Sequence, residues 1–431
     1  MGSLITKEPL SNAEHRRLEY IDTALLWCLM GLVVILPVAH TVSIRLFFLL
    51  LAALLWAFKL WRNRSRKIFG TPVDLALGLF FLTIIISFFT SLNLSYSAGK
   101  LRSEFLTYTL LFYVTAGSVR RQGDTNKLIL TLFGGSFIMA VYGMYNAFYV
   151  KDVDPLAIAH RMGSLHQGYE AYAQYLIMVL PFNILWLIYP AGGATPVGGE
   201  GRARHRAVLW GLLVLNVSAL YLTHTRGAWI AFWVEVLLII FFAIKKTALK
   251  AGLIAAFVAL SALFVVSLPS DVLWHGKSGV SLDEKTMMES NTGNTRLVMW
   301  KASVEELAKN PFKGAGYGKT MFRWRFKGRA FAGIEQAHNT FVNTAIQLGI
   351  QGLLALVFII CVVIRMNWQG FKDARDGFEA MFFLSVMVMT AGFFIANQFA
   401  EFYIDDTALL FWLLVGLSAG LYAGRDKGAA S

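Results

Sequence analysis

The chain is poor in charged residues. Only 15% of its 431 residues are Asp, Glu, Lys or Arg, whereas 57% are hydrophobic. A soluble globular protein carries roughly a quarter charged residues. So little charge excludes a disordered chain, which needs low hydrophobicity and high charge. It also argues against a soluble enzyme, which at this length would divide into about three domains.

Proline and cysteine are scarce as well. The nine prolines form no polar, Pro-rich linker that would divide the chain into soluble units. Cys28 and Cys361 are the only cysteines, and both fall in apolar runs. The sequence therefore holds no disulfide framework and no zinc-type cluster of Cys and His. The 34 Phe and 12 Trp, in contrast, suit lipid-facing surfaces and interfacial belts. Together these features indicate an integral membrane protein.

Apolar runs long enough to cross a bilayer as a helix, about 20 residues, predict the fold class. We expect an all-α polytopic membrane protein with about twelve transmembrane helices and one large loop domain. The expected spans are residues 21–39, 42–61, 73–90, 102–119, 128–150, 169–189, 207–223, 227–243, 248–268, 338–364, 378–400 and 407–424. Nine spans thus lie in residues 1–268, the loop domain in 269–337, and three spans with a tail in 338–431.

Basic residues predict the orientation of the chain. Lys and Arg gather in cytoplasmic loops, and 21 of them fall in one alternating set of segments, against six in the other short loops. Both termini should therefore be cytoplasmic, with the long loop on the opposite, outer side. Orientation and anionic headgroups account for most of the +13 net charge, so no nucleic-acid partner is expected. Basic residues on the outer side have no such explanation.

The long outer segment should contain an amphipathic helix from residue 294 or 295 to about 309. The apolar residues that recur there at helical spacing, and so predict its buried face, are Leu297, Trp300, Val304, Leu307 and Ala308. Arg296 would lie in the first turn, where the helix dipole disfavours a cation. We therefore expect an anionic group close to Arg296.

Two further patterns follow this helix. Gly314, Gly316 and Gly318 predict a tight turn in which the backbone approaches another segment closely. A phosphate loop is excluded, because no strand precedes the glycines and no Gly-Lys-Ser/Thr follows. Aromatic and basic residues then alternate over 322–329, which is typical of a half-buried strand or of an interfacial segment with its cations on lipid phosphates. Either would allow binding of a phosphorylated amphiphile.

Histidine and arginine on the outer side are the candidates for chemistry. His338 opens the span 338–364, where the positive end of the helix should lower its pKa and favour the neutral form that suits a general base. The alternative is a capping or interfacial histidine. Arg161 lies in the loop after the fifth span and Arg226 in a tight turn between two spans. Guanidinium groups converging from Arg161, Arg226 and Arg296 would bind a diphosphate through bidentate hydrogen bonds.

Metal chemistry has little support. Asp152 and Asp154 have the spacing of a metal-ligating pair, and the Asp405-Asp406 pair lies on the same side. Pro155 follows the first pair directly, which favours a turn. We therefore expect no metal and no other cofactor. No nucleophile-elbow pattern supports hydrolysis by a serine triad.

Several of these features resemble the O-antigen ligases, within the O-antigen ligase/polymerase superfamily of membrane glycosyltransferases. They are the twelve-span topology with a late outer loop, the run from Thr225 to Trp229, the loop run from Arg296 to Trp300 that leads to 310–316, and His338-Asn339 before the next span. Gly349 to Gly352 also looks like the family. The resemblance covers about residues 20–420 and implies a GT-C-like fold.

The resemblance implies a metal-independent, inverting transfer of polymerised glycan. The donor would be undecaprenyl diphosphate and the acceptor lipid A-core, at the periplasmic face of a Gram-negative inner membrane, with membrane lipids as further partners. His338 would be the base. Arg161 and Arg226 would bind the diphosphate, and Arg296 less securely, because its loop varies in the family. The candidate acceptor-binding residues are Arg323, Arg325 and Asn339. The loop 161–166 departs from the family pattern, with Gln167-Gly168 in place of Pro-Asn, so a role for His166 stays open.

Two alternatives remain from the sequence. An O-antigen polymerase or a protein O-oligosaccharyltransferase of the same superfamily would differ only in its acceptor. A lipid flippase or transporter should carry ionisable residues deep within its spans and internal repeats. Glu235 is the exception among ionisable residues that otherwise sit near span ends, and no repeat is found.

Overall fold

The computed structural model describes residues 12–62, 70–150, 161–166, 168–189, 199–267, 292–331, 333–399 and 405–428. Every regular element within these ranges is helical. The helices are α1 (Asn12–Ile35), α2 (Val42–Arg62), α3 (Asp74–Phe88), α4 (Leu94–Lys100), the π-helix η1 (Leu101–Leu106), α5 (Thr107–Ser118), α6 (Gln122–Tyr145), the π-helix η2 (Asn146–Val150), α7 (Tyr169–Ile188), α8 (Gly199–Leu222), α9 (Arg226–Ala243), α10 (Thr247–Ser267), α12 (Thr292–Lys309), α13 (Thr320–Arg325), α14 (Thr340–Leu348), α15 (Ile350–Lys372), α16 (Gly377–Ala396) and α17 (Asp405–Gly428).

Nine helices of the described ranges are long and apolar enough to cross a bilayer. They are α1, α2, α6, α7, α8, α9, α15, α16 and α17. The polytopic, all-helical class is therefore confirmed. The other predicted spans correspond to α3, to α10, and to α4, η1 and α5, which follow one another without a break. Glu104 in η1 is buried but forms an ion pair of 2.7 Å with Lys100, which neutralises its charge.

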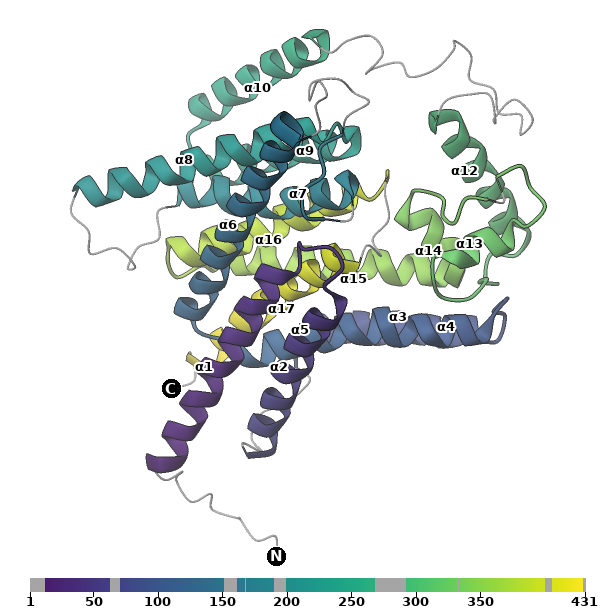
Figure 1. Ribbon diagram of the computed structural model, residues 1–431, viewed down its shortest axis with the longest axis horizontal. Helices are drawn as coiled ribbons and strands as arrows, with labels where there is room; N and C mark the ends of the chain where they lie inside the picture. The colour runs from purple at the N-terminus through teal and green to yellow at the C-terminus, as the bar shows by residue number, and fades with distance from the viewer. Residues whose placement is uncertain are drawn as a thin grey trace, which may run out of the picture.

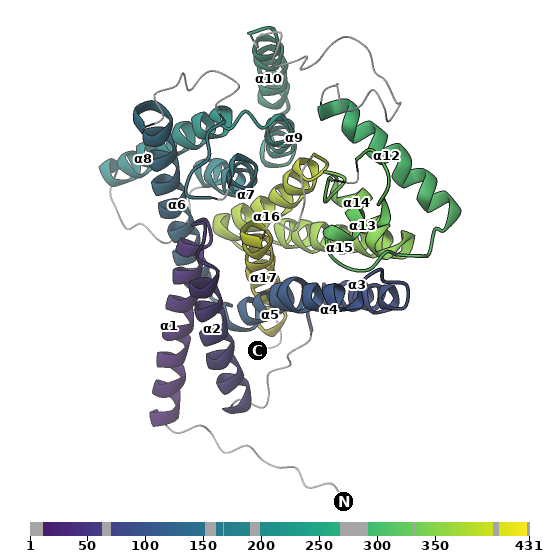
Figure 2. The same ribbon diagram turned by 45° about the vertical axis from the view of Figure 1, so that its right-hand side comes forward.

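Three helices form the centre of the bundle. The apolar windows of α7, α16 and α17 are 83%, 78% and 83% buried, against 28% for α2 at the periphery. Figures 1 and 2 show α16 and α17 in the middle, with α1 and α2 to one side. Helix α17 packs on α5 through glycines, since a Cβ atom at Gly420 would lie 2.5 Å from the carbonyl oxygen of Val119. Such close backbone approach stabilises helix pairs in lipid.

The predicted continuous span 338–364 is wrong. Helix α14 ends at Leu348 and α15 begins at Ile350, because Gly349 between them has φ = 78°. Glycine reaches this left-handed region without the steric cost of a Cβ atom. The membrane-spanning helix is therefore α15, which runs on to Lys372. His338 precedes a separate nine-residue helix rather than the span itself.

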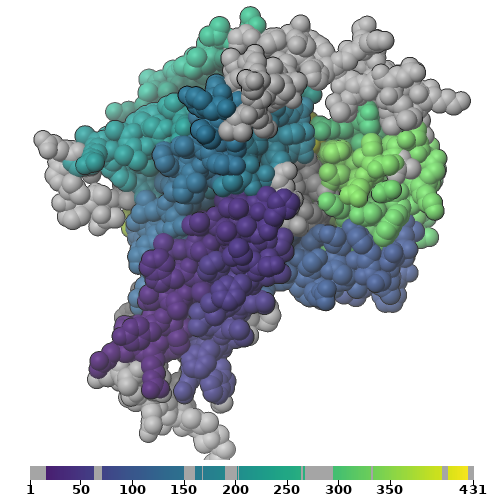
Figure 3. Space-filling view, viewed as in Figure 1, coloured from purple at the N-terminus to yellow at the C-terminus, as the bar shows by residue number. Residues whose placement is uncertain are grey.

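Helices α12, α13 and α14 gather at one end of the bundle, to the right in Figure 1, and we call residues 292–348 the α12–α14 unit. Its interior is a small apolar cluster of its own, which includes Met299, Met321, Phe322, Phe331 and Ile346. Figure 3 shows the unit, in green, resting on α3 and α4, in blue. The unit is thus held by packing as well as by its connection to α15.

The predicted half-buried strand at 322–329 is also wrong. The segment begins with α13, and the rings of Phe322 and Phe326 are both buried in the α12–α14 cluster. Residues four apart share one face of a helix, so this spacing buries both rings on the same side. The aromatic groups therefore stabilise the unit instead of entering lipid headgroups.

The amphipathic helix is confirmed as α12, but its predicted buried face is confirmed only in part, since Trp300 and Leu307 pack against the apolar cluster of the unit. Leu297 and Val304, expected to point inward, are 41% and 63% exposed. Val298, Met299 and Ala302 are buried instead. Packing against α14 selects this face, which periodicity within one helix cannot specify.

The glycine turn packs against the end of α14 within the α12–α14 unit. The backbone amides of Ala315 and Gly316 donate to the carbonyl oxygens of Ile346 and Gln347, over 2.9 and 3.0 Å. These carbonyls belong to the last turn of α14 and lack partners within the helix. A Cβ atom at Gly314 would clash with the Gln347 carbonyl. The predicted close approach of the backbone is confirmed.

Replacing Gly314 with Ala should therefore destabilise the protein. The added methyl group would overpack the contact with α14, at a cost of about 1–3 kcal/mol. Thermal unfolding in detergent should show a lower midpoint. Gly333→Ala is the matched control, because a Cβ atom there would meet nothing within 4 Å. Equal midpoints for the two variants would contradict this account of the turn.

Candidate active site

A cavity of about 680 Å³ lies between the α12–α14 unit and the ends of α7 and α9 nearest to it. Its volume is within the range of small-molecule sites. The charged and imidazole groups that line it are Arg161, Glu170, His224, Arg226, Arg296 and His338. The structure thus brings together the predicted base and all three predicted diphosphate ligands, which are far apart in the sequence.

Arg161 reaches the cavity from the loop before α7. Its guanidinium lies 4.6 Å from the centre of the Tyr169 ring, a cation–π contact. Two hydrogen bonds tie this loop to the bundle, one to α8 and one to α6. The Met162 amide donates to the carbonyl of Leu222 over 2.9 Å, and the Ser164 hydroxyl donates to the carbonyl of Met139 over 2.6 Å. These bonds fix where the arginine enters the cavity.

Arg226 is the first residue of α9, directly after the turn that joins α8 to α9. His224 in this turn has φ = 49°, a left-handed conformation that histidine adopts more readily than most residues. Gly227 has no room for a side chain, since a Cβ atom would lie 2.8 Å from the Phe399 ring. The turn is therefore held in one conformation, with Arg226 and the N-terminal end of α9 at the cavity, and the positive end of a helix dipole favours an anion.

Arg296 comes from α12 and is half-buried. Burial lowers the pKa of its guanidinium, the Glu170 carboxylate raises it, and the guanidinium groups of Arg226 and Arg161 lower it further. All four charged groups of the cavity therefore interact electrostatically. Glu170 is the anionic group expected close to Arg296.

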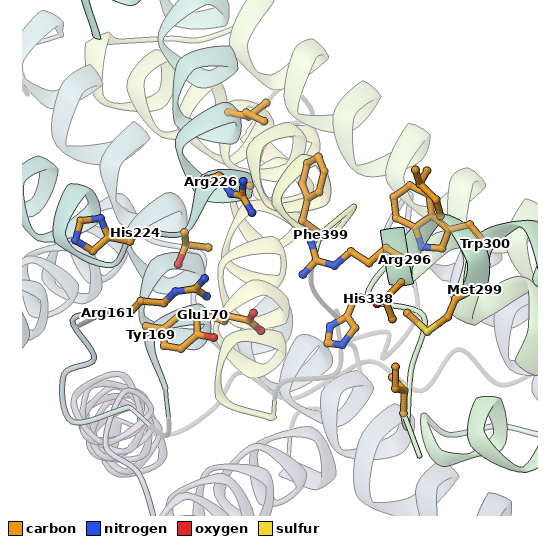
Figure 4. A pocket seen from close by; sticks show the side chains of 16 residues that line it. Arg161, Tyr169, Glu170, His224, Arg226, Arg296, Met299, Trp300, His338 and Phe399 are labelled. Atoms are coloured by element: carbon orange, nitrogen blue, oxygen red, sulfur yellow. The ribbon is translucent and has the colours of Figure 1, made fainter. Parts of the chain in front are cut away.

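Sequence reasoning missed Glu170. It is the second residue of α7 and lines the cavity between Arg161 on one side and Arg296 on the other (Figure 4). The available signal was an acidic residue at the outer end of an apolar span. That signal is ambiguous, because the dipole of any helix favours a carboxylate in its first turn.

His338 lies just before α14 with φ = 50°. The N-cap of α14 is Asn339, whose side-chain oxygen accepts hydrogen bonds from the amides of Phe341 and Val342 over 3.0 and 3.1 Å. The alternative role of His338 as a helix cap is therefore wrong. Within the described ranges, its buried Nδ1 has no hydrogen-bond partner.

The backbone at His338 is held from two directions. The Trp300 indole in α12 donates to the Ala337 carbonyl over 2.9 Å. On the other side, the Asn339 side chain donates to Gln398 over 3.1 Å. Burial, and then the Arg296 guanidinium, lower the pKa of His338 below its usual 6.5. The predicted direction is confirmed, although its causes are burial and a neighbouring cation rather than a helix end. The imidazole is thus neutral near pH 7 and able to accept a proton.

The candidate acceptor-binding residues do not line this cavity. Arg325 forms an ion pair with Glu306 of α12, and Arg323 is exposed on α13. Asn339 is occupied as the α14 cap.

His166 is buried away from the cavity, 3.7 Å from the Asp406 carboxylate. Burial, with a contribution from Arg45, lowers its pKa to about 3. Asp152 and Asp154 lie outside the described residues. In the part of the chain that is described, no three His, Cys, Asp or Glu side chains form a group that could hold a metal ion.

Fold and cavity together define a polytopic membrane protein with a cationic, histidine-containing site at one end of its bundle. Residues 211–357 match a family model described as O-antigen ligase, a domain of glycan-transferring membrane enzymes that O-antigen ligases and polymerases share. The matched segment contains Arg226, Arg296 and His338, whereas Arg161 and Glu170 precede it. A comparison with curated proteins finds no match.

Proposed function

We propose that the protein is an O-antigen ligase, which transfers polymerised glycan from undecaprenyl diphosphate to lipid A-core. The convergence of three guanidinium groups with His338 on one cavity carries this proposal. Arginine binds phosphate oxygens through paired hydrogen bonds, which suits a diphosphate better than a single carboxylate. The protein would lie in the inner membrane of a Gram-negative cell, with cytoplasmic termini and a periplasmic site.

The proposed reaction is a direct displacement. The acceptor hydroxyl oxygen attacks the anomeric carbon from the side opposite the diphosphate, and His338 takes the hydroxyl proton. The bond between the anomeric carbon and the diphosphate oxygen breaks, and its electron pair leaves with that oxygen. Arg161, Arg226 and Arg296 stabilise the charge that develops there. Because the hydroxyl attacks opposite the leaving group, the configuration of the anomeric carbon is inverted. The guanidinium groups take the part that a divalent cation plays in other enzymes, so we propose a metal-independent transfer.

A lipid-linked donor also fits the surface next to the cavity. Ile230, one turn below Arg226 in α9, lines the cavity and is exposed at the bundle surface. Leu237 and Phe241 extend the exposed apolar stripe along the same helix. A prenyl chain lying on this stripe would place its diphosphate beside Arg226 at the membrane edge.

The polymerase and the protein O-oligosaccharyltransferase share the donor and differ in acceptor. Of the candidate acceptor contacts, we retain Arg323, whose exposed guanidinium on the α12–α14 unit is free to meet a phosphorylated core. Ion-paired Arg325 and the capping residue Asn339 have structural partners.

Gel profiling of lipopolysaccharide from a deletion strain separates these functions. For a ligase, the ladder should disappear while lipid-linked polymer accumulates, and the wild-type gene should restore the ladder. A band with a single repeat unit would indicate a polymerase instead. An unchanged ladder, with altered glycoprotein, would indicate transfer to protein.

His338→Ala should abolish transfer in a purified assay and leave the fold intact. Loss of a general base lowers a rate typically by 10²–10⁴-fold. His40→Ala is the matched control, because His40 is also a left-handed histidine but does not line the cavity. Initial rates and thermal midpoints of both variants check this. Near-normal turnover of His338→Ala would rule out the assignment as base.

Transfer should depend on pH through His338. The base acts when neutral, and its pKa lies below 6.5, so the rate should hold down to about pH 6.5 and fall only below that. Arg296→Gln removes a cation that lowers this pKa, so the acid limb should move to higher pH, whatever the loss in absolute rate. An acid limb that stays in place in Arg296→Gln would contradict the coupling between the two residues.

A further inference from the structure

Glu170 poses a problem for a diphosphate site. Its carboxylate lines the same cavity as three guanidinium groups and would repel an anionic donor. The dipole of α7 accounts for an acidic residue in the first turn. It does not account for a position facing the cations across the cavity, as Figure 4 shows. The carboxylate therefore calls for a role in the site.

The carboxylate acts on the arginines through space. Glu170 interacts electrostatically with Arg296 and with Arg161. Arg161 itself is stacked on Tyr169, and Arg296 is held by α12. The carboxylate is thus placed to set the charge of the cavity without occupying a guanidinium fork, which leaves the forks available to phosphate oxygens.

The charges match the proposed donor. Three guanidinium groups and one carboxylate give the cavity a net charge of +2, apart from its imidazoles. A diphosphate esterified on both phosphates, as in a glycan–diphosphate–lipid, carries two negative charges. Donor and cavity therefore neutralise each other. Without Glu170 the cavity would hold one uncompensated positive charge.

The charge balance between the ligand and the cavity changes after transfer. The leaving diphosphate keeps one ester and gains a third ionisable oxygen, while His338 gains the acceptor proton. These two new charges cancel as long as the proton stays on the imidazole. Once His338 releases the proton, the product carries more negative charge than the cavity offsets, since a phosphate monoester is mostly doubly ionised near pH 7. Glu170 then repels the product.

We propose that Glu170 sets the charge of this cavity so that the site accepts the diphosphate diester and expels the diphosphate monoester. This inference rests on the proposed function. Glu170 acts through Arg161 and Arg296, as a positioning residue. A cavity of net charge +3 would bind the product best and would be inhibited by it.

Glu170→Gln in the full-length protein tests the proposal, with undecaprenyl diphosphate as the probe. The variant should bind this product about tenfold more tightly, or about 1.4 kcal/mol, which is the interaction of two unit charges about 12 Å apart at an effective dielectric constant of about 20. The steady-state rate should fall by a similar factor through product inhibition. The single-turnover rate should stay within about threefold of wild type. Calorimetric binding and rapid-quench transfer give these values.

Two further variants complete the comparison. Glu170→Asp keeps the charge and should resemble wild type in product affinity. Glu305→Gln removes a carboxylate from the exposed face of α12, outside the cavity, and should change neither affinity nor rate. Unchanged or weaker product binding in Glu170→Gln, or a large loss of its single-turnover rate, would overturn the proposal. A wild-type protein that neither transfers glycan nor binds the diphosphate would refute the proposed function itself.

Discussion

Mutual repulsion of cations at the edge of a membrane is the constraint on which the site depends. Arg161, Arg226 and Arg296 approach one another in a partly buried cavity, where like charges are poorly screened. The segments that carry the three arginines are held in place by hydrogen bonds and by packing against the bundle. Arg226 begins α9 and Arg296 lies within α12, while the loop of Arg161 and the turn before Arg226 are held by backbone hydrogen bonds and by close packing. The stability of the bundle thus offsets the electrostatic cost of bringing the three guanidinium groups together.

The α12–α14 unit links this electrostatic arrangement to His338. The buried methionine Met299 anchors α12 in the apolar cluster beside Arg296. Trp300, on the same helix, bonds to the residue before His338. The glycine turn donates hydrogen bonds to the last carbonyls of α14, the helix that follows His338. Arginine and imidazole are therefore fixed relative to each other by one small core, and a disturbance of that core alters both groups together.

Much of the architecture could be predicted because its signals are local. Long apolar runs mark most of the spans, and α12 follows from its own periodicity. The candidate arginines stand out once the basic residues attributed to chain orientation are set aside. The wrong predictions have one common cause, which is packing between segments that are distant in the sequence. The break at Gly349, the helical state of 322–326 and the buried face of α12 are decided by contacts with distant segments. Glu170 was missed because its sequence context is that of any helix start.

The exposed apolar stripe of α9 has a kinetic consequence. A ligand that reaches the cavity along Ile230 and Phe241 arrives from within the bilayer. Its encounter with the protein is then diffusion in two dimensions, governed by the number of ligand molecules per unit area of membrane. Bulk concentration ceases to be the relevant variable. Saturation of such a protein would shift when inert lipid is added at constant volume, as it does for enzymes subject to surface dilution.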